Sequence, residues 1–186
     1  MAPPRHIEPE YRAFPNEDGR NWRQERVEIP LMLRALDLPR RARILEIGCG
    51  RGVALPVLAR RLEPIRLVGV DIDAALLSQA SRRLRQTGTH AELVAADVRR
   101  LPFDDQDFDL VIDFGTCFHV ARSDDALREV TRMLTCRGIF ATETRLSQLL
   151  SHPIRSRGRF LPWTAAPALA PRRRAGLWQS HWRAPA

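Results

Sequence analysis

The sequence predicts an α/β fold, a doubly wound and mostly parallel sheet of about five clear strands with helices on both faces. Three observations lead to this prediction. Short apolar runs alternate with helical segments of roughly 10–15 residues through the middle of the chain. A glycine-rich turn, GCGRG, joins the first apolar run to the helical segment after it. Acidic residues, among them Asp71, Asp97 and Asp113, stand where these runs end.

Length and composition limit the class of protein. The chain has 186 residues, of which 44% are hydrophobic and 28% are charged, as expected for one globular domain with a sizeable core. The longest uncharged run, residues 160–171, contains internal prolines and is too short to span a bilayer. The first residues have the pattern of neither a secretory signal nor a transit peptide, and the three cysteines lack metal-ligand spacing. We therefore expect a cytoplasmic protein with reduced thiols, no membrane span and no metal site.

The net positive charge comes from one end of the sequence. All 30 basic residues are arginines, and the formal net charge is +8. Residues 1–143 contain 22 arginines and 22 acidic residues, whereas residues 144–186 contain 8 arginines and no acidic residue. The body of the protein is therefore not predicted to bind nucleic acid, and the basic tail leaves RNA binding open as an alternative.

Three regions are predicted along the chain. Residues 1–40 form an N-terminal helical lid or cap, residues 41–144 the α/β core, and residues 145–186 a basic extension rich in Pro, Arg and Trp. In the first region we expect a helix from about residue 20, an interruption at Pro30 and then a second short helix.

The elements of the core follow from hydrophobic periodicity and capping residues. Strands are predicted at residues 43–47, 65–70, 91–96, 108–113 and 138–142. Helices are predicted at residues 52–62, 74–86 and 124–134, with Asp73 and Ser123 as N-caps and Gly88 as the stop of the second. No clear strand is predicted after residue 143.

Aromatic residues in the N-terminal region allow two interpretations. Tyr11, Phe14 and Trp22 form a lid over a bound ligand, or they pack the first helix on the sheet. The sequence does not decide between the two.

A doubly wound sheet binds its ligand beyond the carboxyl ends of its strands. The glycine turn allows backbone to approach a ligand, and the helix after it offers unpaired N–H groups. Glu46 lies inside the first strand, where a buried carboxylate is costly unless it has a partner or a role. Asp71 ends the second strand, where a carboxylate can accept both hydroxyls of a ribose. A nicotinamide-dinucleotide site is disfavoured because Val53 stands where that glycine pattern needs its third glycine.

Four segments together resemble a known family. They are ILEIGCGRG (residues 44–52), LVGVDID (67–73), AADVRRLPFDDQDFDLVI (95–112) and LREVTRMLTCRGIFATE (127–143). In this order and spacing they resemble the class I, Rossmann-like S-adenosylmethionine-dependent methyltransferases, with the strongest likeness to the small-molecule, type 11 subgroup. The likeness covers roughly 100 residues, and several weak motifs in register are more specific than one.

The resemblance implies S-adenosylmethionine as the cofactor and residues 41–144 as the domain that binds it. Glu46 would face the methionine end, the glycines would give backbone approach, and Asp71 would hold the ribose. Ile72 would pack on the adenine, Asp97 would receive its amino group, and Val98 would offer backbone to the ring. The full set implied to bind the cofactor is Glu46, Gly48, Cys49, Gly50, Gly52, Asp71, Ile72, Asp97, Val98, Asp113 and Phe114.

The segment after the fourth strand is expected to face the methyl acceptor. Relatives that methylate amide or base nitrogens carry Asn/Asp-Pro-Pro-Tyr/Phe there, whereas this chain has DFGTCF. A small-molecule acceptor methylated at oxygen or carbon is therefore favoured. His119 is the candidate catalytic base, and Cys117 is interpreted as a buried thiol and not as a nucleophile.

The tail departs from the family, whose members usually end with two more strands, one of them antiparallel. Three options remain open: the tail covers the sheet edge, a second subunit covers it as a homodimer, or the chain is a shortened relative. The rival functions are a non-catalytic S-adenosylmethionine-binding protein and an RNA methyltransferase that docks through its basic tail.

Overall fold

A computed structural model describes residues 17–118, 120, 122–143 and 179–183, and every structural statement below concerns these residues. The helical elements are α1 (Glu17–Arg23), the π-helix η1 (Gln24–Glu28), α2 (Ile29–Ala35), α3 (Leu55–Leu62), α4 (Ala74–Thr87), the 3-10 helix η2 (Thr116–Phe118) and α5 (Ser123–Met133). The strands are β1 (Arg43–Ile47), β2 (Arg66–Asp71), β3 (Glu92–Ala95), β4 (Phe108–Asp113), β5 (Leu134–Glu143) and β6 (Gln179–Arg183).

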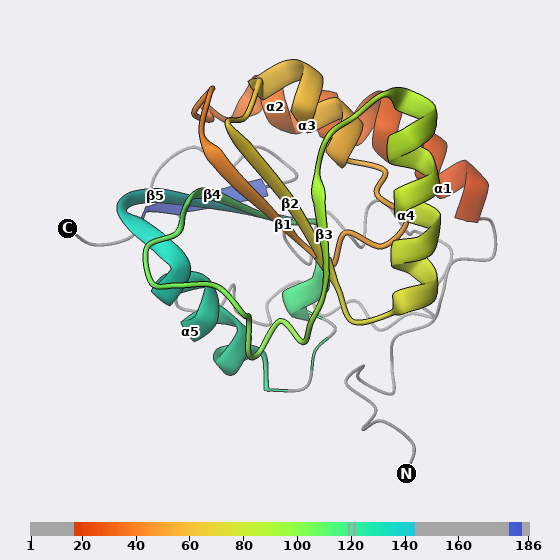
Figure 1. Cartoon of the computed structure of the whole chain (residues 1–186). Coiled ribbons are helices and arrows are strands. Elements are labelled where there is room, and N and C mark those ends of the chain that lie inside the picture. The colour runs from red at the N-terminus through yellow and green to blue at the C-terminus, as the bar shows by residue number, and fades with distance from the viewer. Residues whose placement is uncertain (1–16, 119, 121, 144–178, 184–186) are drawn as a thin grey trace, which may run out of the picture.

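The strands form one six-stranded sheet in the order β3-β2-β1-β4-β5-β6 (Figure 1). The first five strands are parallel, and β6 pairs antiparallel with β5. The direction in which successive strands are added reverses at β1, which lies between β2 and β4. Doubly wound sheets bind ligands at the carboxyl ends of the strands beside this point. The predicted α/β class with a doubly wound, mostly parallel sheet is confirmed.

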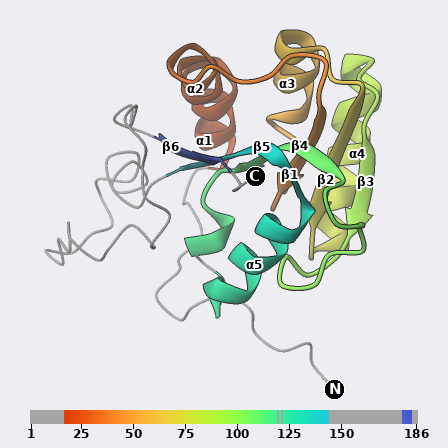
Figure 2. The same ribbon diagram turned by 90° about the vertical axis from the view of Figure 1, so that its left-hand side faces the viewer.

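The two faces of the sheet are covered by different helices (Figure 2). Helices α2, α3 and α4 pack on one face, where Ile44 of β1 belongs to their apolar cluster. Helix α5 packs on the other, where Leu45 and Ile47 contact its cluster. Successive residues of β1 therefore serve opposite faces, as the period of a strand requires, and Glu46 falls on the side of α3.

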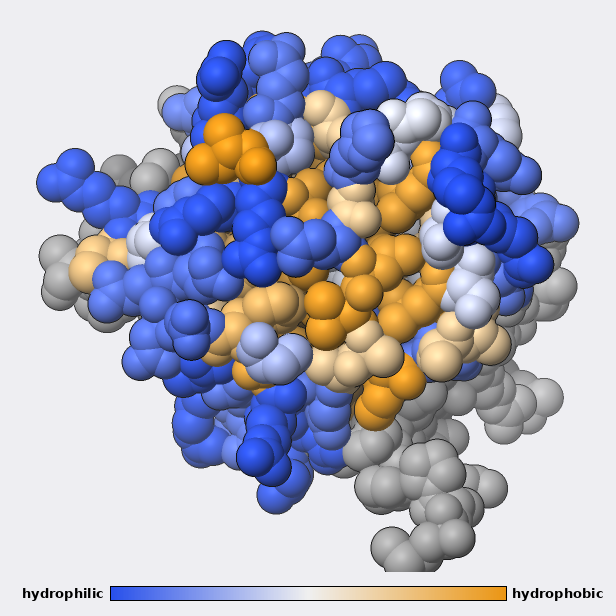
Figure 3. Space-filling model, viewed as in Figure 1, coloured by the Kyte–Doolittle hydropathy of each residue, from blue (hydrophilic) through white to orange (hydrophobic). Residues whose placement is uncertain are grey.

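Strand β3 forms one edge of the sheet, between α4 and α5 in the view of Figure 1. Its side chains Leu93 and Val94 are only partly buried, and they pack on the two different core clusters. Figure 3, seen from the same side, shows apolar surface gathered at the middle of this view with hydrophilic residues around it. The four-residue length of β3 limits how far another strand could pair with this edge.

Helix α4 shows why the capping signals were informative. The Asp73 side chain accepts hydrogen bonds from the backbone N–H groups of Ala75 and Leu76, and Gly88 ends the helix at a φ of 61°. The strands predicted at residues 43–47 and 108–113 have the same bounds in the structure. The other strands of the core occur where expected, within a few residues at each end.

The expected break at Pro30 is wrong. Residues 17–35 form one continuous helical run, in which η1 lies directly before α2. Pro30 occupies the first turn of α2, where its missing N–H costs little, and the wider π turn comes just before it.

Two predicted helix starts are also wrong. Helix α3 begins at Leu55 and not at residue 52, because residues 51–54 complete the turn after β1. Ser123 is the first residue of α5, and Arg122 occupies the N-cap at a φ of 58° without a side-chain cap. Leu134, expected in this helix, instead opens β5.

The tail contributes a strand that its sequence did not indicate. In β6, Trp182 pairs with Phe140 and Ser180 with Thr142. The expectation of no strand after residue 143 is therefore wrong, and the edge of β5 is covered by the chain's own tail. One antiparallel strand, which the family usually has, is thus present. The sequence of this basic segment has no strand periodicity, because the stability of β6 depends on its pairing with the distant strand β5 and not on a local pattern.

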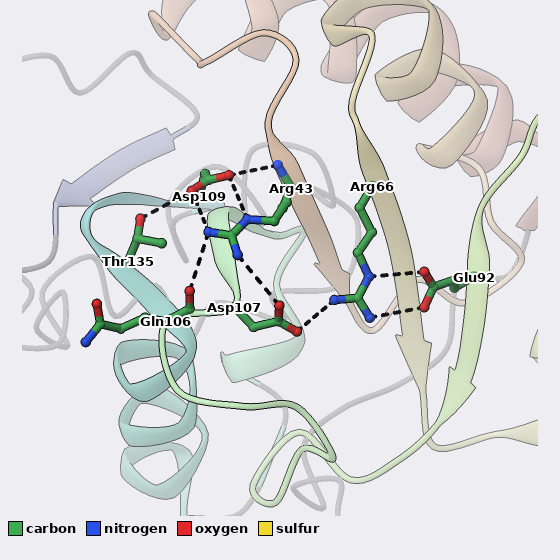
Figure 4. Close-up of polar contacts among 7 residues, drawn as sticks. All are labelled: Arg43, Arg66, Glu92, Gln106, Asp107, Asp109 and Thr135. Carbon is green, nitrogen blue, oxygen red and sulfur yellow. Dashed lines mark hydrogen bonds and ion pairs between the residues drawn. The ribbon is translucent and has the colours of Figure 1, made fainter.

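The amino ends of the strands are joined by ion pairs (Figure 4). Arg43 of β1 binds the carboxylate of Asp109 in β4, with its Nη2 3.1 Å from Oδ1 and its backbone N 3.0 Å from Oδ2. Arg66 of β2 bridges Asp107, at 2.7 Å, and Glu92, at 3.1 Å. These contacts tie four parallel strands together at the end of the sheet opposite their carboxyl ends.

We predict that Asp109→Asn lowers the free energy of unfolding by about 1 kcal/mol at pH 7. Partial burial opposes ionisation of Asp109, but the hydrogen bonds from Arg43 outweigh it and hold the pKa below its ordinary value. Stability from a lowered pKa is present above the unfolded-state pKa and is lost as the pH falls through the folded-state pKa. The difference between the two proteins should therefore shrink in acid, below about pH 4.

Urea unfolding between pH 3 and pH 7 measures this difference. Asp104→Asn, at an exposed carboxylate on the loop before β4, is the matched control and should leave stability unchanged. A pH-independent difference for Asp109→Asn would contradict the assignment of the stability to this ion pair.

Candidate cofactor and active site

The turn after β1 contains three glycines in the left-handed region, with φ values of 64°, 52° and 68° at Gly48, Gly50 and Gly52. A Cβ at Gly48 would overlap the side chain of Thr116, and one at Gly52 would lie 2.9 Å from the Cβ of Ala80. These two glycines are therefore required by close packing. At Gly50, in contrast, nothing lies within 4 Å of the Cβ position, so this residue borders open space at the carboxyl end of β1. Backbone at this point is available to a ligand.

Asp71 is held beside this turn by backbone donors. Its Oδ2 accepts from the N–H of Gly50 at 2.8 Å, and its Oδ1 accepts from the N–H of Asp73 at 2.9 Å. A carboxylate offers about four lone-pair directions, so these contacts orient it while leaving acceptor capacity on each oxygen. Ile72, next in sequence, is 49% exposed and presents an apolar side chain to solvent at the same edge.

Glu46 is a buried acid in the middle of the sheet. It is 2% exposed, and its Oε2 has no hydrogen-bond partner among the described residues. Burial, followed by the nearby carboxylates of Asp71 and Asp113, raises its pKa well above the ordinary value. A buried, unsatisfied acid beside two other carboxylates favours a cationic ligand, which would stabilise its ionised form.

Asp113, at the carboxyl end of β4, organises the segment after it. Its Oδ1 accepts from the N–H of Thr116 at 2.6 Å, and its Oδ2 accepts from Cys117 N–H at 3.3 Å and from the Thr142 hydroxyl at 3.1 Å. Burial raises its pKa, although these hydrogen bonds lower it in part. The side chain holds η2 against β5, and the contact with the cofactor implied for Asp113 stays a prediction.

Asp97 follows β3 and is paired with Arg99. The Arg99 Nη2 lies 2.6 Å from Oδ2, and the Arg99 backbone N–H donates to Oδ1 at 2.9 Å. Val98 between them is 7% exposed. Asp97 lies at the same edge as Asp71, because the N–H of Ala96 donates to the Asp71 carbonyl at 3.1 Å.

The cysteines near the turn are unsuited to nucleophilic chemistry. Cys117 is buried, and burial raises its pKa well above the ordinary value. Cys49 is also buried, and burial together with Glu46 and Asp71 raises its pKa. Both therefore stay protonated, which agrees with the interpretation of Cys117 as an inert thiol.

The remaining predicted residues are less defined. Phe114 is partly buried and packs against the cluster on the α3 side of the sheet. His119, the candidate base, lies outside the described residues, as do Tyr11 and Phe14 of the expected lid. Trp22 is described and is 63% exposed on α1, so the packing of this helical run on the sheet comes from Ile29 and its neighbours in α2.

Two residues that contact the site were missed in the sequence. Thr142, the second-last residue of β5, holds Asp113, and its position at the carboxyl end of a strand was the signal that could have identified it. Arg99 pairs with Asp97, but in a chain with 30 arginines the sequence alone does not single it out.

Comparison with known proteins places this geometry in a family. Residues 44–138 match the sequence model of a family described as "Methyltransferase domain". The chain belongs to this methyltransferase domain family. The match begins in β1 and runs to the middle of β5, so it covers the glycine turn and all four candidate carboxylates, Glu46, Asp71, Asp97 and Asp113.

Curated relatives of this methyltransferase domain share part of its length. The chain is 36% identical over 98 residues to a fatty-acid O-methyltransferase of Mycolicibacterium smegmatis, covering 53% of this chain and 35% of the relative. It is 31% identical over 138 residues to a phthiotriol/phenolphthiotriol dimycocerosates methyltransferase of Mycobacterium tuberculosis, covering 64% of this chain and 50% of the relative. The chain therefore spans half or less of the length of these two relatives.

Solved structures agree with the fold of the methyltransferase domain. The PH0226 protein of Pyrococcus horikoshii is similar with a TM-score of 0.62 at 28% identity, over 77% of this chain and 69% of that one. The [4+2]-cyclase SpnF is similar with a TM-score of 0.57 at 25% identity, over 62% of this chain and 43% of that one. The predicted class I, Rossmann-like fold is confirmed.

The cofactor of this family is S-adenosylmethionine, and the described residues fit it. The unpartnered oxygen of Glu46 suits the cationic methionine end, and the space at Gly50 admits a ligand against backbone. Asp71, held by the N–H of Gly50, keeps acceptor capacity that the hydroxyl groups of a ribose would use. Within the described ranges no group of His, Cys, Asp and Glu could hold a metal ion, and no helix there is long and apolar enough to cross a membrane.

We predict that Glu46→Gln stabilises the fold and weakens cofactor binding. The raised pKa means that Glu46 ionises more readily in the unfolded chain, so the native protein loses stability as the pH rises above the ordinary Glu value. Removing the carboxyl should raise the free energy of unfolding by about 1–3 kcal/mol at pH 7.5, with no gain near pH 4. The affinity for S-adenosylmethionine should fall about tenfold or more.

Thermal unfolding across pH 4–8 and calorimetric titration with S-adenosylmethionine test both parts. In the parent protein, binding of the cation should release a proton and tighten as the pH rises towards the raised pKa of Glu46. Glu63→Gln, at an exposed carboxylate, is the control. Unchanged stability together with unchanged affinity in Glu46→Gln would refute the role given to this residue.

A second prediction compares Gly50→Ala with Gly88→Ala. Both glycines have positive φ, and both have open space at the Cβ position, so each substitution should cost about 1 kcal/mol of stability. Only Gly50 borders the candidate site, so only Gly50→Ala should weaken S-adenosylmethionine binding, by about tenfold or more. Equal affinity of the two variants in the same titration would show that the turn does not contact the cofactor.

Proposed function

We propose that this chain transfers the methyl group of S-adenosylmethionine to a small-molecule acceptor, at oxygen or carbon. The observation that carries the proposal is the buried carboxyl of Glu46, whose Oε2 has no partner in the described structure and lies at the glycine turn. The family match supports the same assignment.

When bound, S-adenosylmethionine supplies a methyl group activated by the positive charge of its sulfonium. The chain then has to align the acceptor with the methyl group and to keep the cation bound, and both tasks need fixed geometry. Gly50, Asp71 and Glu46 would bind the cofactor from β1 and β2. Asp113 fixes the segment after β4, which would face the acceptor.

The acceptor is proposed to be a lipid-like small molecule methylated at oxygen. Support comes from the names of relatives, one a fatty-acid O-methyltransferase and another a phthiotriol/phenolphthiotriol dimycocerosates methyltransferase. A carboxylate acceptor is already deprotonated at neutral pH and needs no base, whereas a hydroxyl acceptor would require one. His119 remains the proposed base for the hydroxyl case.

A second candidate function is cofactor binding without methyl transfer. Its support is the similarity to SpnF, a protein named as a [4+2]-cyclase, since one fold can serve different reactions. RNA methylation through the basic tail rests on charge alone, because most of that tail lies outside the described residues.

Two measurements on the full chain test the proposal: calorimetric titration with S-adenosylmethionine, and transfer of a labelled methyl group to fatty acids and to long-chain alcohols. We expect micromolar or tighter binding and labelled product from at least one acceptor class. Asp71→Asn should weaken binding about tenfold, and Asp104→Asn should not. Binding without transfer to any acceptor would favour the second candidate, and absence of binding would overturn both.

A further inference from the structure

The loop after β3 contains a charge pair at the place where the base of the cofactor is expected. Arg99 donates to both oxygens of Asp97, from Nε at 3.0 Å to Oδ1 and from Nη2 at 2.6 Å to Oδ2. The Arg99 backbone N–H adds a third donor at 2.9 Å. A carboxylate bound by such a fork cannot rotate freely, so its acceptor directions are set by Arg99.

This pair lies in a partly dry position. The Arg99 side chain is 14% exposed, the Asp97 side chain is 29% exposed, and Val98 between them is buried. The hydrogen bond to Asp97 raises the pKa of Arg99, and Asp125 at the start of α5 acts in the same direction. Arg99 is thus charged, and the Asp125 carboxylate of α5 is near enough to favour that charge.

The loop that contains the pair is fixed to α5 by a second pair of side chains. The Glu129 Oε2 accepts from the N–H of Leu101 at 2.8 Å, and the Arg132 Nη2 donates to the Leu101 carbonyl at 3.2 Å. Arg132 also donates to the Phe103 carbonyl at 2.8 Å. Both polar groups of the Leu101 backbone are therefore bound by one helix, and the loop cannot shift without breaking these contacts.

The register of the sheet places Asp97 beside the residues expected to hold the ribose. Asp71 pairs with Ala95 across β2 and β3, and Asp97 comes two residues later. A ligand whose ribose lies against Asp71 and whose base lies along the exposed Ile72 would direct the edge of that base at Asp97. In that arrangement the orientation of the Asp97 carboxylate would decide which functional group on the base is accepted.

We propose that Arg99 is a positioning residue that orients the Asp97 carboxylate to accept the exocyclic amine of adenine and to reject a base with an oxo group there. The inference rests on the proposed function, because it assumes that the adenosyl group binds at this edge. A fixed carboxylate accepts a hydrogen bond from an amine, but it meets the lone pairs of an oxo group. A carboxylate that could rotate away would lose the hydrogen bond from the amine, and it would also no longer repel the oxo group.

The test measures the affinity of two ligands, S-adenosylhomocysteine and S-inosylhomocysteine, which differ in the amine or oxo group at C6 of the base and in the proton that the oxo form carries on N1. The readout is the ratio of their dissociation constants in the full chain. We expect a strong adenosyl preference in the parent protein, about a tenfold smaller preference in Arg99→Met, and an intermediate one in Arg99→Lys. Asp97→Asn should remove the part of the preference that comes from the group at C6, because an amide can present either a donor or an acceptor. Adding Arg99→Met should change the ratio no further, and the part that comes from N1 should be common to all variants.

Arg100→Met is the matched control, since Arg100 is the exposed neighbour of Arg99, and it should keep the parent ratio. Arg99→Lys retains a positive charge and tests the role even if Arg99→Met unfolds. An unchanged ratio in the Arg99 variants, or an equal loss of affinity for both ligands, would overturn the inference while the proposed function stands. A parent protein that binds neither ligand would overturn the proposed function and this inference with it.

Discussion

The convergence of carboxyl groups at the carboxyl ends of three adjacent strands is the constraint on which the site depends. Glu46, Asp71 and Asp113 come from β1, β2 and β4, and each of the other two raises the pKa of the buried Glu46. Asp71 and Asp113 are held by backbone N–H groups, but the Oε2 of Glu46 has no partner among the described residues. A buried acid beside two other carboxylates at this end of the sheet favours a cationic ligand.

Ion pairs at the opposite end of the sheet, where the strands begin, stabilise the fold. There the same parallel strands are joined by Arg43 and Arg66, which bind Asp107, Asp109 and Glu92, so each of these three carboxylates has an arginine partner. Arginine suits this position because its planar fork can bind two carboxylates at once. The amino ends of the strands are thus held together by ion pairs. At the carboxyl ends, the Oε2 of Glu46 is left to interact with a ligand.

Helix α5 connects the parts of the site that the sheet alone does not fix. It binds the loop after β3 through Glu129 and Arg132, and it follows η2, whose N–H groups bind Asp113. The base side and the acceptor side of the proposed site therefore share one rigid support. In turn, β5 holds Asp113 through Thr142, which pairs with Ser180 of the tail strand β6.

The sequence by itself determined the α/β class, the bounds of β1 and β4, the caps of α4 and the glycine turn, because these depend on local periodicity, capping and backbone freedom. It also predicted that Asp71 and Asp113 lie at strand ends and that Glu46 lies inside the first strand, since these positions follow from the strand bounds. It did not reveal β6, the uninterrupted helical run across Pro30, or the partners of Asp97 and Asp113. Those features depend on contacts between residues far apart in the chain, such as Thr142 with Asp113 or Trp182 with Phe140, and only the packed tertiary structure brings such residues together.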